Sequence, residues 1–264
     1  MKFPRPINLK AKTIARGLFG DSLYRLLATV RRAKHDRRVG GVDDVRRSKF
    51  YQQWVKPGDL VFDIGANIGN RTRVFASMGA RVVAVEPLPQ CYWALRWMFK
   101  CKPNVTIIGA AASYDESPKR LTEFEIDTIS TLQQEWIIAS KTSGRFGKIV
   151  PVRELSVACV TLDCLIDKFG IPAFTKIDVE GSELDVLRGL SRSAGTLSFE
   201  VTPELLHLAE QCLERLEMLG YRNFQCSIGE TMTLGKQWFS PAEMRDQLGR
   251  MSEFGDIYAL APAS

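Results

Sequence analysis

The fold is decided by Asp59-Leu-Val-Phe-Asp-Ile-Gly-Ala-Asn-Ile-Gly69. The first half is a short apolar run typical of a buried strand, and the second half is a glycine-rich turn. A helical pattern follows over residues 70–78, and Gly79 stands where a helix commonly ends in a left-handed residue. The stretch therefore predicts a strand, a tight turn and a helix, which is the opening unit of an α/β sheet.

The turn places a carboxylate, Asp63, in front of two spaced glycines, Gly65 and Gly69. Glycine lets the backbone approach a ligand closely, and the helix that follows aims its first amide groups at that ligand. A nicotinamide site would show Gly-x-Gly-x-x-Gly, because a pyrophosphate lies against the turn. That fingerprint is missing here, and a carboxylate suits a ligand with a cationic amino group.

A second carboxylate, Glu86, ends the next expected strand, 23 residues after Asp63. An acid at this place accepts hydrogen bonds from both hydroxyls of a ribose. A cationic amino-acid portion joined to a ribose describes S-adenosylmethionine, which we predict as the cofactor. A nicotinamide-dependent oxidoreductase is the rival enzyme class. The residues predicted to bind the cofactor are Asp63, Gly65, Ala66, Asn67, Gly69 and Glu86.

Strands alternate with helices over residues 50–264, which predicts a parallel-type sheet with helices on both faces. No long helical pattern separates the last two strands, so an antiparallel end to the sheet is compatible with the sequence. The expected strands are 59–66, 81–86, 104–111, 174–179, 197–201, 221–227 and 256–260. The aromatic residues Trp93, Trp97 and Phe99, in an expected helix over 90–99, are interpreted as core packing.

Residues 113–160 interrupt this alternation. Within them, Glu123-Phe-Glu-Ile-Asp127 alternates polar and apolar residues, as an exposed strand does. An insertion of this length is usually functional or disordered. We expect it to recognise the substrate.

The second motif is Lys176-Ile-Asp-Val-Glu-Gly181, at the end of an expected strand. Ligands bind outside the carboxyl ends of the strands in open α/β sheets, and charged groups there are costly unless they bind or react. We predict Asp178, Glu180 and Lys176 as catalytic residues, on one face of an extended strand. Asp178 is the first choice of general base, with no metal ion. The alternative is structural: Glu180 caps the next helix and Lys176 pairs with it.

Together with Thr161-Leu-Asp163, these two motifs resemble the FkbM family of S-adenosylmethionine-dependent methyltransferases over about residues 50–260. The resemblance implies a class I methyltransferase fold, Rossmann-like, with a seven-stranded sheet whose final strand is antiparallel. It also implies methyl transfer to an oxygen, such as a hydroxyl of a sugar, glycoconjugate or secondary metabolite. A non-catalytic binding module is the alternative. Nucleic acid is not an expected partner, because base methyltransferases carry an Asn/Asp-Pro-Pro-aromatic turn where this chain has Asp178-Val-Glu-Gly181.

The N-terminal segment, residues 1–49, carries 14 Lys and Arg against 4 Asp and Glu, whereas residues 50–264 carry 22 against 26. Apolar residues recur at helical spacing over 10–34 among these cations. Residues 35–47 look like a linker or exposed turn. The segment is interpreted as a solvated accessory helix, and contact with an anionic membrane surface is the sharper hypothesis.

The six cysteines form no Cys-x-x-Cys pair and no zinc-type spacing with histidine. Several stand among apolar residues, where cysteine behaves as a small hydrophobic residue, so free thiols and a cytoplasmic location are expected. No Ser-His-Asp set or nucleophile elbow is visible, which disfavours a hydrolase.

Overall fold

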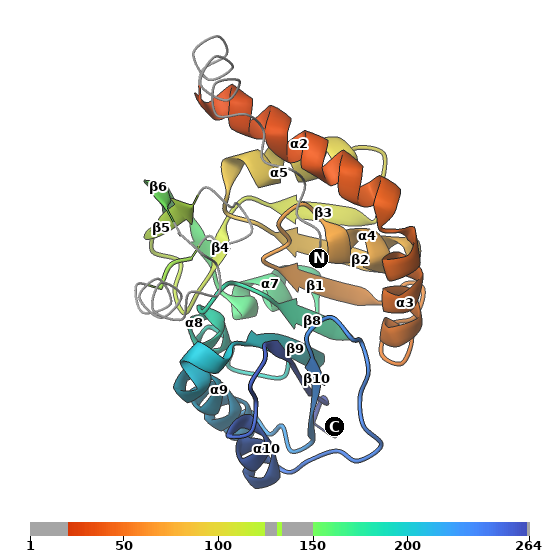
Figure 1. The fold of residues 1–264 in the computed structure, drawn as a ribbon, viewed down its shortest axis with the longest axis vertical. Helices are drawn as coiled ribbons and strands as arrows, with labels where there is room; N and C mark the ends of the chain where they lie inside the picture. Colours follow the sequence, from red (N-terminus) through yellow and green to blue (C-terminus); the bar gives the residue numbers. More distant parts are fainter. Residues whose placement is uncertain (1–20, 125–130, 134–149, 263–264) are drawn as a thin grey trace.

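The computed structural model describes residues 21–124, 131–133 and 150–262, and they form a central sheet with helices on both sides (Figure 1). The first part of the helix expected over 10–34 and the middle of the insertion, including Asp127, lie outside the described residues.

The sheet has seven strands in the order β10-β11-β9-β8-β1-β2-β3. Neighbouring strands run parallel except around β11, which is antiparallel to both β9 and β10. This confirms the predicted class I methyltransferase topology with an antiparallel final strand. The strands are β1 Leu60–Ile64, β2 Arg81–Val85, β3 Val105–Ile108, β8 Phe174–Ile177, β9 Thr196–Val201, β10 Phe224–Ile228 and β11 Gly255–Ala259.

Alternate residues of the strands pack into hydrophobic cores on opposite faces of the sheet. Phe62 and Ile64 of β1 belong to the core beneath the helices α7 to α10, whereas Val61 belongs to the core beneath α3 and α4. Helix α5 packs on this second face as well, through Leu95 against Ala84. The helices are α3 Gly41–Tyr51, α4 Asn70–Ser77, α5 Pro89–Met98, α7 Leu162–Phe169, α8 Glu183–Arg188, α9 Leu206–Met218 and α10 Pro241–Leu248, with a 3₁₀ turn at Pro203–Leu205.

The insertion forms a small structure beside the sheet. Strand β4 (Ala111–Ala112) pairs with β7 (Cys159–Val160), and β5 (Lys119–Phe124) pairs antiparallel with β6 (Pro151–Val157). The expectation of an exposed strand is wrong for Glu123, whose side chain is fully buried. Arg25 and Arg153 both bind its carboxylate, and paired cations of this kind are what allow an acid to be buried.

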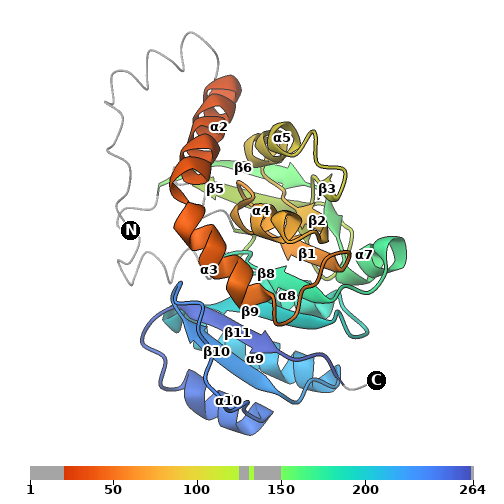
Figure 2. The same ribbon diagram turned by 90° about the vertical axis from the view of Figure 1, so that its right-hand side faces the viewer.

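The N-terminal segment contains no linker in its described part. Helix α2 (Asp21–Val39) is followed after one residue by α3, so residues 35–47, expected as a linker, are helical. Tertiary contacts stabilise these polar helices. Helix α2 packs against α5 (Figure 2). Arg73 of α4 binds Asp44 of α3 at 2.7 Å. The helical pattern is weak in sequence because most of its apolar residues do not face the core.

The two tryptophans of α5 are exposed, contrary to expectation. Trp93 and Trp97 are 54% and 47% exposed, so their interpretation as core residues is wrong. They lie on the outward side of α5, while Leu95 and Ala94 fill the core.

All six cysteines are free thiols, as predicted. Within the described part of the chain, no helix combines the length and the apolar character needed to cross a bilayer.

The aromatic cluster under α3 makes the first testable prediction. Phe174 is fully buried, stacks on Trp54 at 5.3 Å between ring centroids, and contacts Tyr51 and Phe75. Phe174→Ala leaves a cavity where β8 meets α3, and we expect it to lower the free energy of unfolding by about 3–5 kcal/mol in urea titrations. Ile171→Ala is the matched control, because Ile171 is 63% exposed. Equal losses in the two variants would contradict this account of the core.

Candidate active site

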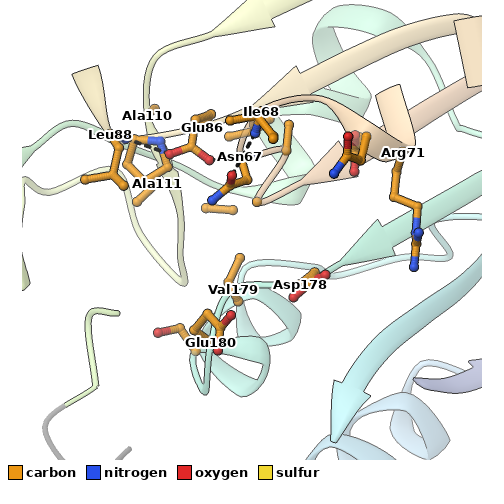
Figure 3. Close-up of a pocket in the computed structure, with 18 of the residues that line it drawn as sticks. Asn67, Ile68, Arg71, Glu86, Leu88, Ala110, Ala111, Asp178, Val179 and Glu180 are labelled. Atoms are coloured by element: carbon orange, nitrogen blue, oxygen red, sulfur yellow. Dashed lines mark hydrogen bonds between the residues drawn. The ribbon is translucent and has the colours of Figure 1, made fainter. Parts of the chain in front are cut away.

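A cavity of about 260 Å³ opens at the carboxyl ends of β1, β2 and β8 (Figure 3). Glu86 and Asn67 lie on one side of it, Asp178 and Glu180 lie on the opposite side, and Arg71 lies at one end. The turn after β1 and the turn after β8, which carry the two motifs singled out in the sequence, therefore face each other across one space. Predicted site residues that line it are Asp63, Gly65, Ala66, Asn67, Glu86, Asp178 and Glu180.

The turn after β1 touches the turn after β8. Gly65 has φ +82°, and a Cβ atom built on it would lie 1.8 Å from the carbonyl oxygen of Asp178. The amide of Asp178 in turn donates to the carbonyl of Ile64 at 2.9 Å. A residue with a side chain at position 65 would push the two turns apart, so the glycine sets the width of the site.

Gly69 has a different role from the one predicted. It does not line the cavity but begins α4 with φ +79°, and a Cβ atom there would lie 2.7 Å from the Leu95 side chain. The residue therefore allows α4 to pack closely against α5. Its effect on a ligand is indirect, through the orientation of the helix.

Glu86 is held by the backbone on both carboxylate oxygens. The amide of Asn67 donates to Oε2 at 2.8 Å, and the amide of Leu88 donates to Oε1 at 2.8 Å. Asn67 adopts φ +49°, and Arg32 of α2 donates to its side-chain oxygen at 2.6 Å. A carboxylate oxygen accepts more than one hydrogen bond, so Glu86 keeps acceptor capacity toward the cavity.

Asp63 lies deeper, in β1, and is 2% exposed. Its carboxylate accepts a hydrogen bond of 2.5 Å from the hydroxyl of Thr72. Burial raises the pKa of Asp63 above its ordinary value, against the opposing effects of Thr72 and the Lys176 charge. A cationic ligand in the cavity would therefore find a carboxylate whose charge lacks solvent stabilisation, which strengthens their attraction.

Asp178 and Glu180 come together by a turn and not by strand alternation. Strand β8 ends at Ile177, and Glu180 adopts φ +53°, with its carbonyl accepting from the Thr131 hydroxyl at 2.6 Å. The expectation that residues 178 and 180 share one face of an extended strand is therefore wrong, because the strand ends before them. Their carboxylates nonetheless lie close together, within 4.8 Å of each other and of Glu200.

Lys176 does not line the cavity. It is 2% exposed, and its ammonium group lies 3.0 Å from Asp256 and 3.4 Å from Asp178. Burial alone would lower the pKa of Lys176, but the carboxylates of Asp178 and Asp256 outweigh it and raise the pKa well above its ordinary value. Lys176 is thus a permanent cation behind Asp178, placed to orient that carboxylate and not to touch a substrate.

Glu200, in β9, is a site residue that the sequence reasoning missed. Burial, followed by the charges of Asp178 and Glu180, raises the pKa of Glu200 well above its ordinary value. The signal was present, because Glu200 is an acid inside the otherwise apolar and hydroxylic strand 196–201.

Arg71 and Glu230 form a second missed pair in the cavity wall. One guanidinium nitrogen of Arg71 donates to both oxygens of Glu230, at 2.9 and 2.8 Å, and Arg47 also donates to Glu230. Burial acts against ionisation, yet Arg71 and Arg47 lower the pKa of Glu230 to about 2. A cation in the first turn of α4, where the helix dipole favours acids, was the available sequence signal for Arg71.

Glu183 supports the turn that carries Asp178 and Glu180. Its carboxylate accepts from the amides of Val179 and Gly181, at 3.1 and 3.3 Å. Ser182, the residue before α8, does not cap the helix with its side chain, because its hydroxyl makes no hydrogen bond. Burial raises the pKa of Glu183 to about 7.

Comparison with known proteins gives one family and a set of similar folds. Residues 63–257 match the methyltransferase FkbM domain. No match was found among curated proteins.

Solved structures with similar folds share little sequence identity with this chain. A precorrin-6Y C5,15-methyltransferase from Geobacter metallireducens has a TM-score of 0.42 and 15% identity, covering 81% of this chain and 87% of that chain. An S-adenosylmethionine-dependent O-methyltransferase from Thermotoga maritima has a TM-score of 0.42 and 12% identity, covering 85% and 66%. Fibrillarin from Aeropyrum pernix, with bound S-adenosylmethionine, has a TM-score of 0.39 and 13% identity, covering 78% and 68%. At these values the likeness concerns the fold alone.

The raised pKa of Glu183 predicts a specific pH dependence of stability. An unfolded glutamate has a pKa of about 4.5, so between pH 4.5 and 7 the folded protein holds a proton that the unfolded chain has lost. The contribution of Glu183 to the free energy of unfolding therefore falls as pH rises through this window, by up to about 3 kcal/mol. Glu183→Gln keeps the amide contacts without the charge, so the variant should gain on the wild type from acidic to mildly alkaline pH.

Urea unfolding at a series of pH values measures this difference. Glu210→Gln, on the exposed side of α9, is the matched control and should track the wild type at every pH. A constant offset between Glu183→Gln and the wild type across the window would contradict the prediction.

Proposed function

The chain belongs to the FkbM family of S-adenosylmethionine-dependent methyltransferases, and from that premise we propose that it methylates a hydroxyl oxygen of a small molecule or glycan. The observation that carries the proposal is the position of Asp178. Its side chain is 38% exposed and lies on the cavity wall opposite Glu86 and Asn67. A proton acceptor thus faces the residues that would hold the cofactor.

The donor set of the cavity fits S-adenosylmethionine. Asp63 and Glu86 offer carboxylates to an amino group and to ribose hydroxyls, and Arg71 offers a guanidinium to the carboxylate of an amino acid. The same two acids would repel a pyrophosphate, and the family match gives no support to a nicotinamide-dependent oxidoreductase. Bound S-adenosylmethionine supplies an electrophilic methyl group on a sulfonium centre.

The chain's own residues have two tasks in this chemistry. The first is alignment: the cavity walls hold the acceptor oxygen in line with the methyl group, which contributes on the order of 7–11 kcal/mol by making the step effectively unimolecular. The second is proton removal, because a hydroxyl is a poor nucleophile while protonated. We assign this role to the Asp178 carboxylate, with Glu180 beside it as a hydrogen-bond acceptor for the substrate.

Two neighbours keep Asp178 suited to this role. Lys176, at 3.4 Å, supplies a permanent positive charge that fixes the carboxylate from behind. The raised pKa of Glu200 favours its neutral form, which adds no negative charge to the cluster and has an O–H to donate to the adjacent carboxylates. We therefore treat Lys176 and Glu200 as positioning residues for Asp178.

The acidic wall also bears on the class of acceptor. Asp178 and Glu180 face the cavity and Glu200 lies beside them, so a phosphate group near the reacting oxygen would be repelled. A neutral hydroxylated acceptor, such as a sugar or a secondary metabolite, fits this wall better than nucleic acid. If the chain catalyses no methyl transfer, the alternative is a methyltransferase-like binding module.

Removing Glu86 tests the cofactor assignment. Glu86→Ala deletes the carboxylate proposed to accept hydrogen bonds from the ribose hydroxyls. Since hydrogen bonds to a charged group contribute roughly 1.5–3 kcal/mol, we expect S-adenosylhomocysteine to bind at least about tenfold more weakly in calorimetry. Glu116→Ala, an exposed acid outside the cavity, should bind like the wild type. Thermal unfolding of both variants checks that the fold is intact. Unchanged affinity in a folded Glu86→Ala protein would remove Glu86 from the site.

Removing the charge of Asp178 tests the chemistry. Asp178→Asn keeps the shape, so cofactor affinity should stay nearly unchanged while turnover falls at least about tenfold, within the range for a lost general base. The acceptor for this assay comes from mass spectrometry of an extract incubated with labelled cofactor. Asp246→Asn, on the exposed side of α10, is the control.

Two results would count against this mechanism. Wild-type turnover in Asp178→Asn would exclude Asp178 as the base and pass the role to Glu180, which Glu180→Gln tests. Failure of the wild type to consume cofactor with a broad panel of hydroxylated acceptors would favour the binding module.

A further inference from the structure

The outward side of α2 carries apolar and cationic residues in one stripe. Leu23 and Leu27 are 45% and 53% exposed, although Leu is the residue type expected to face the core. Arg31, Lys34 and Arg38 continue the stripe at helical spacing and are all exposed. The opposite side of α2 holds its buried residues, including Thr29 and Ala33, against the domain.

Helix α5 carries a second stripe of the same composition. Trp93 and Trp97 are 54% and 47% exposed, the exposed residue Arg96 stands beside them at helical spacing, and the exposed residue Lys100 follows in the turn after the helix. The two helices pack against each other and lie side by side (Figures 1 and 2). The ammonium group of Lys34 lies 4.7 Å from the ring centroid of Trp97, so the two stripes adjoin. We call them together the α2–α5 surface: Leu23, Leu27, Arg31, Lys34, Arg38, Trp93, Arg96, Trp97 and Lys100.

The α2–α5 surface is strongly positive. It contains five cations and no acid, and the sequence has no Asp or Glu over residues 87–114. Over residues 22–39 the sole acid is Asp36, which is half-buried and accepts a hydrogen bond from Asn70. Residues 50–264 as a whole carry 22 Lys and Arg against 26 Asp and Glu, so this surface is more positive than the rest of the domain.

We propose that the α2–α5 surface docks on an anionic lipid membrane, with α2 lying in the plane of the interface. Tryptophan is enriched at the level of lipid headgroups, where its ring is apolar and its N–H remains hydrated. Arginine and lysine in the same layer attract anionic headgroups, and the exposed leucines enter the boundary of the acyl chains. A nucleic-acid surface would use the cations and the indole rings but would have no use for Leu23 and Leu27.

Docking on this surface leaves the cofactor turn in place. Arg32 and Asp36 lie on the domain side of α2, where they bind Asn67 and Asn70 at the start of α4. Variants on the outward side therefore should not alter cofactor affinity. This separates a loss of membrane binding from damage to the site, and it makes the proposal independent of the reaction assigned above.

Co-sedimentation of the full chain with lipid vesicles tests the proposal. We expect binding to vesicles of phosphatidylcholine with phosphatidylglycerol, weak binding to vesicles of phosphatidylcholine alone, and a loss of binding at high salt. Arg31→Ser with Arg38→Ser should weaken binding about tenfold or more. Leu23→Ser with Leu27→Ser should weaken it about fivefold or more, because two buried apolar side chains are lost.

The matched controls are Arg120→Ser and Met218→Ser. Arg120 has a side chain 85% exposed on β5, and Met218 is 77% exposed on α9, so each removes a similar group from another surface. Both should bind anionic vesicles like the wild type. Calorimetry with S-adenosylhomocysteine and thermal unfolding should be unchanged in all of these variants.

Tryptophan fluorescence gives a direct readout of contact. Anionic vesicles should shift the emission to shorter wavelength, and lipids brominated on the acyl chain should quench it; Trp93→Phe with Trp97→Phe should abolish both effects. The proposal is overturned if the wild type fails to sediment, if it binds neutral vesicles equally well, or if the leucine and arginine variants bind like the controls. Tighter binding to an RNA or DNA oligonucleotide than to vesicles would assign the surface to nucleic acid instead.

Discussion

The site depends on the close approach of two backbone turns, at Gly65 after β1 and at Asp178 after β8. A Cβ atom at position 65 would lie 1.8 Å from the Asp178 carbonyl oxygen, so the approach exists only because position 65 is glycine. The turn after β1 leads to Asn67, whose amide binds Glu86 at the end of β2, and the turn after β8 leads to Glu180. The distance between the Glu86 side and the Glu180 side of the cavity is thus set by the backbone, before any side chain is considered.

Around this contact the protein buries several charged side chains, and these have hydrogen-bond or ion-pair partners. Lys176 lies between Asp178 and Asp256, while Asp63 accepts from Thr72. Isolated charges in a low-dielectric interior would destabilise the fold by several kcal/mol each, whereas paired ones hold their neighbours in one geometry. The same burial raises the pKa values of Glu183 and Glu200 above the ordinary value of a glutamate.

The N-terminal helices connect this interior to the molecular surface. On its inner side, α2 binds the cofactor turn through Arg32 and the insertion through the Arg25–Glu123 ion pair. On its outer side, it presents the cations and leucines of the α2–α5 surface. One helix therefore contacts the cofactor side of the site, the segment expected to recognise the acceptor, and the side proposed to meet the membrane. A methyltransferase working on an acceptor near a lipid surface would have its site braced by the element that docks.

The sequence by itself determined the features that depend on local pattern. Alternating strands and helices with glycine turns predicted the sheet. Acids at strand ends mark the ligand side of an α/β sheet, and Asp63, Glu86 and Asp178, singled out for that reason, line one cavity. Tertiary structure decided what depends on neighbours distant in the chain. The helical state of residues 35–47 comes from packing on α4 and α5, and the exposure of Trp93 and Trp97 depends on which side of α5 the sheet covers. Glu200 lies beside Asp178 because β9 pairs with β8, and Asp256 reaches Lys176 because β11 lies next to β9 in the sheet. No local pattern in the sequence encodes these strand pairings.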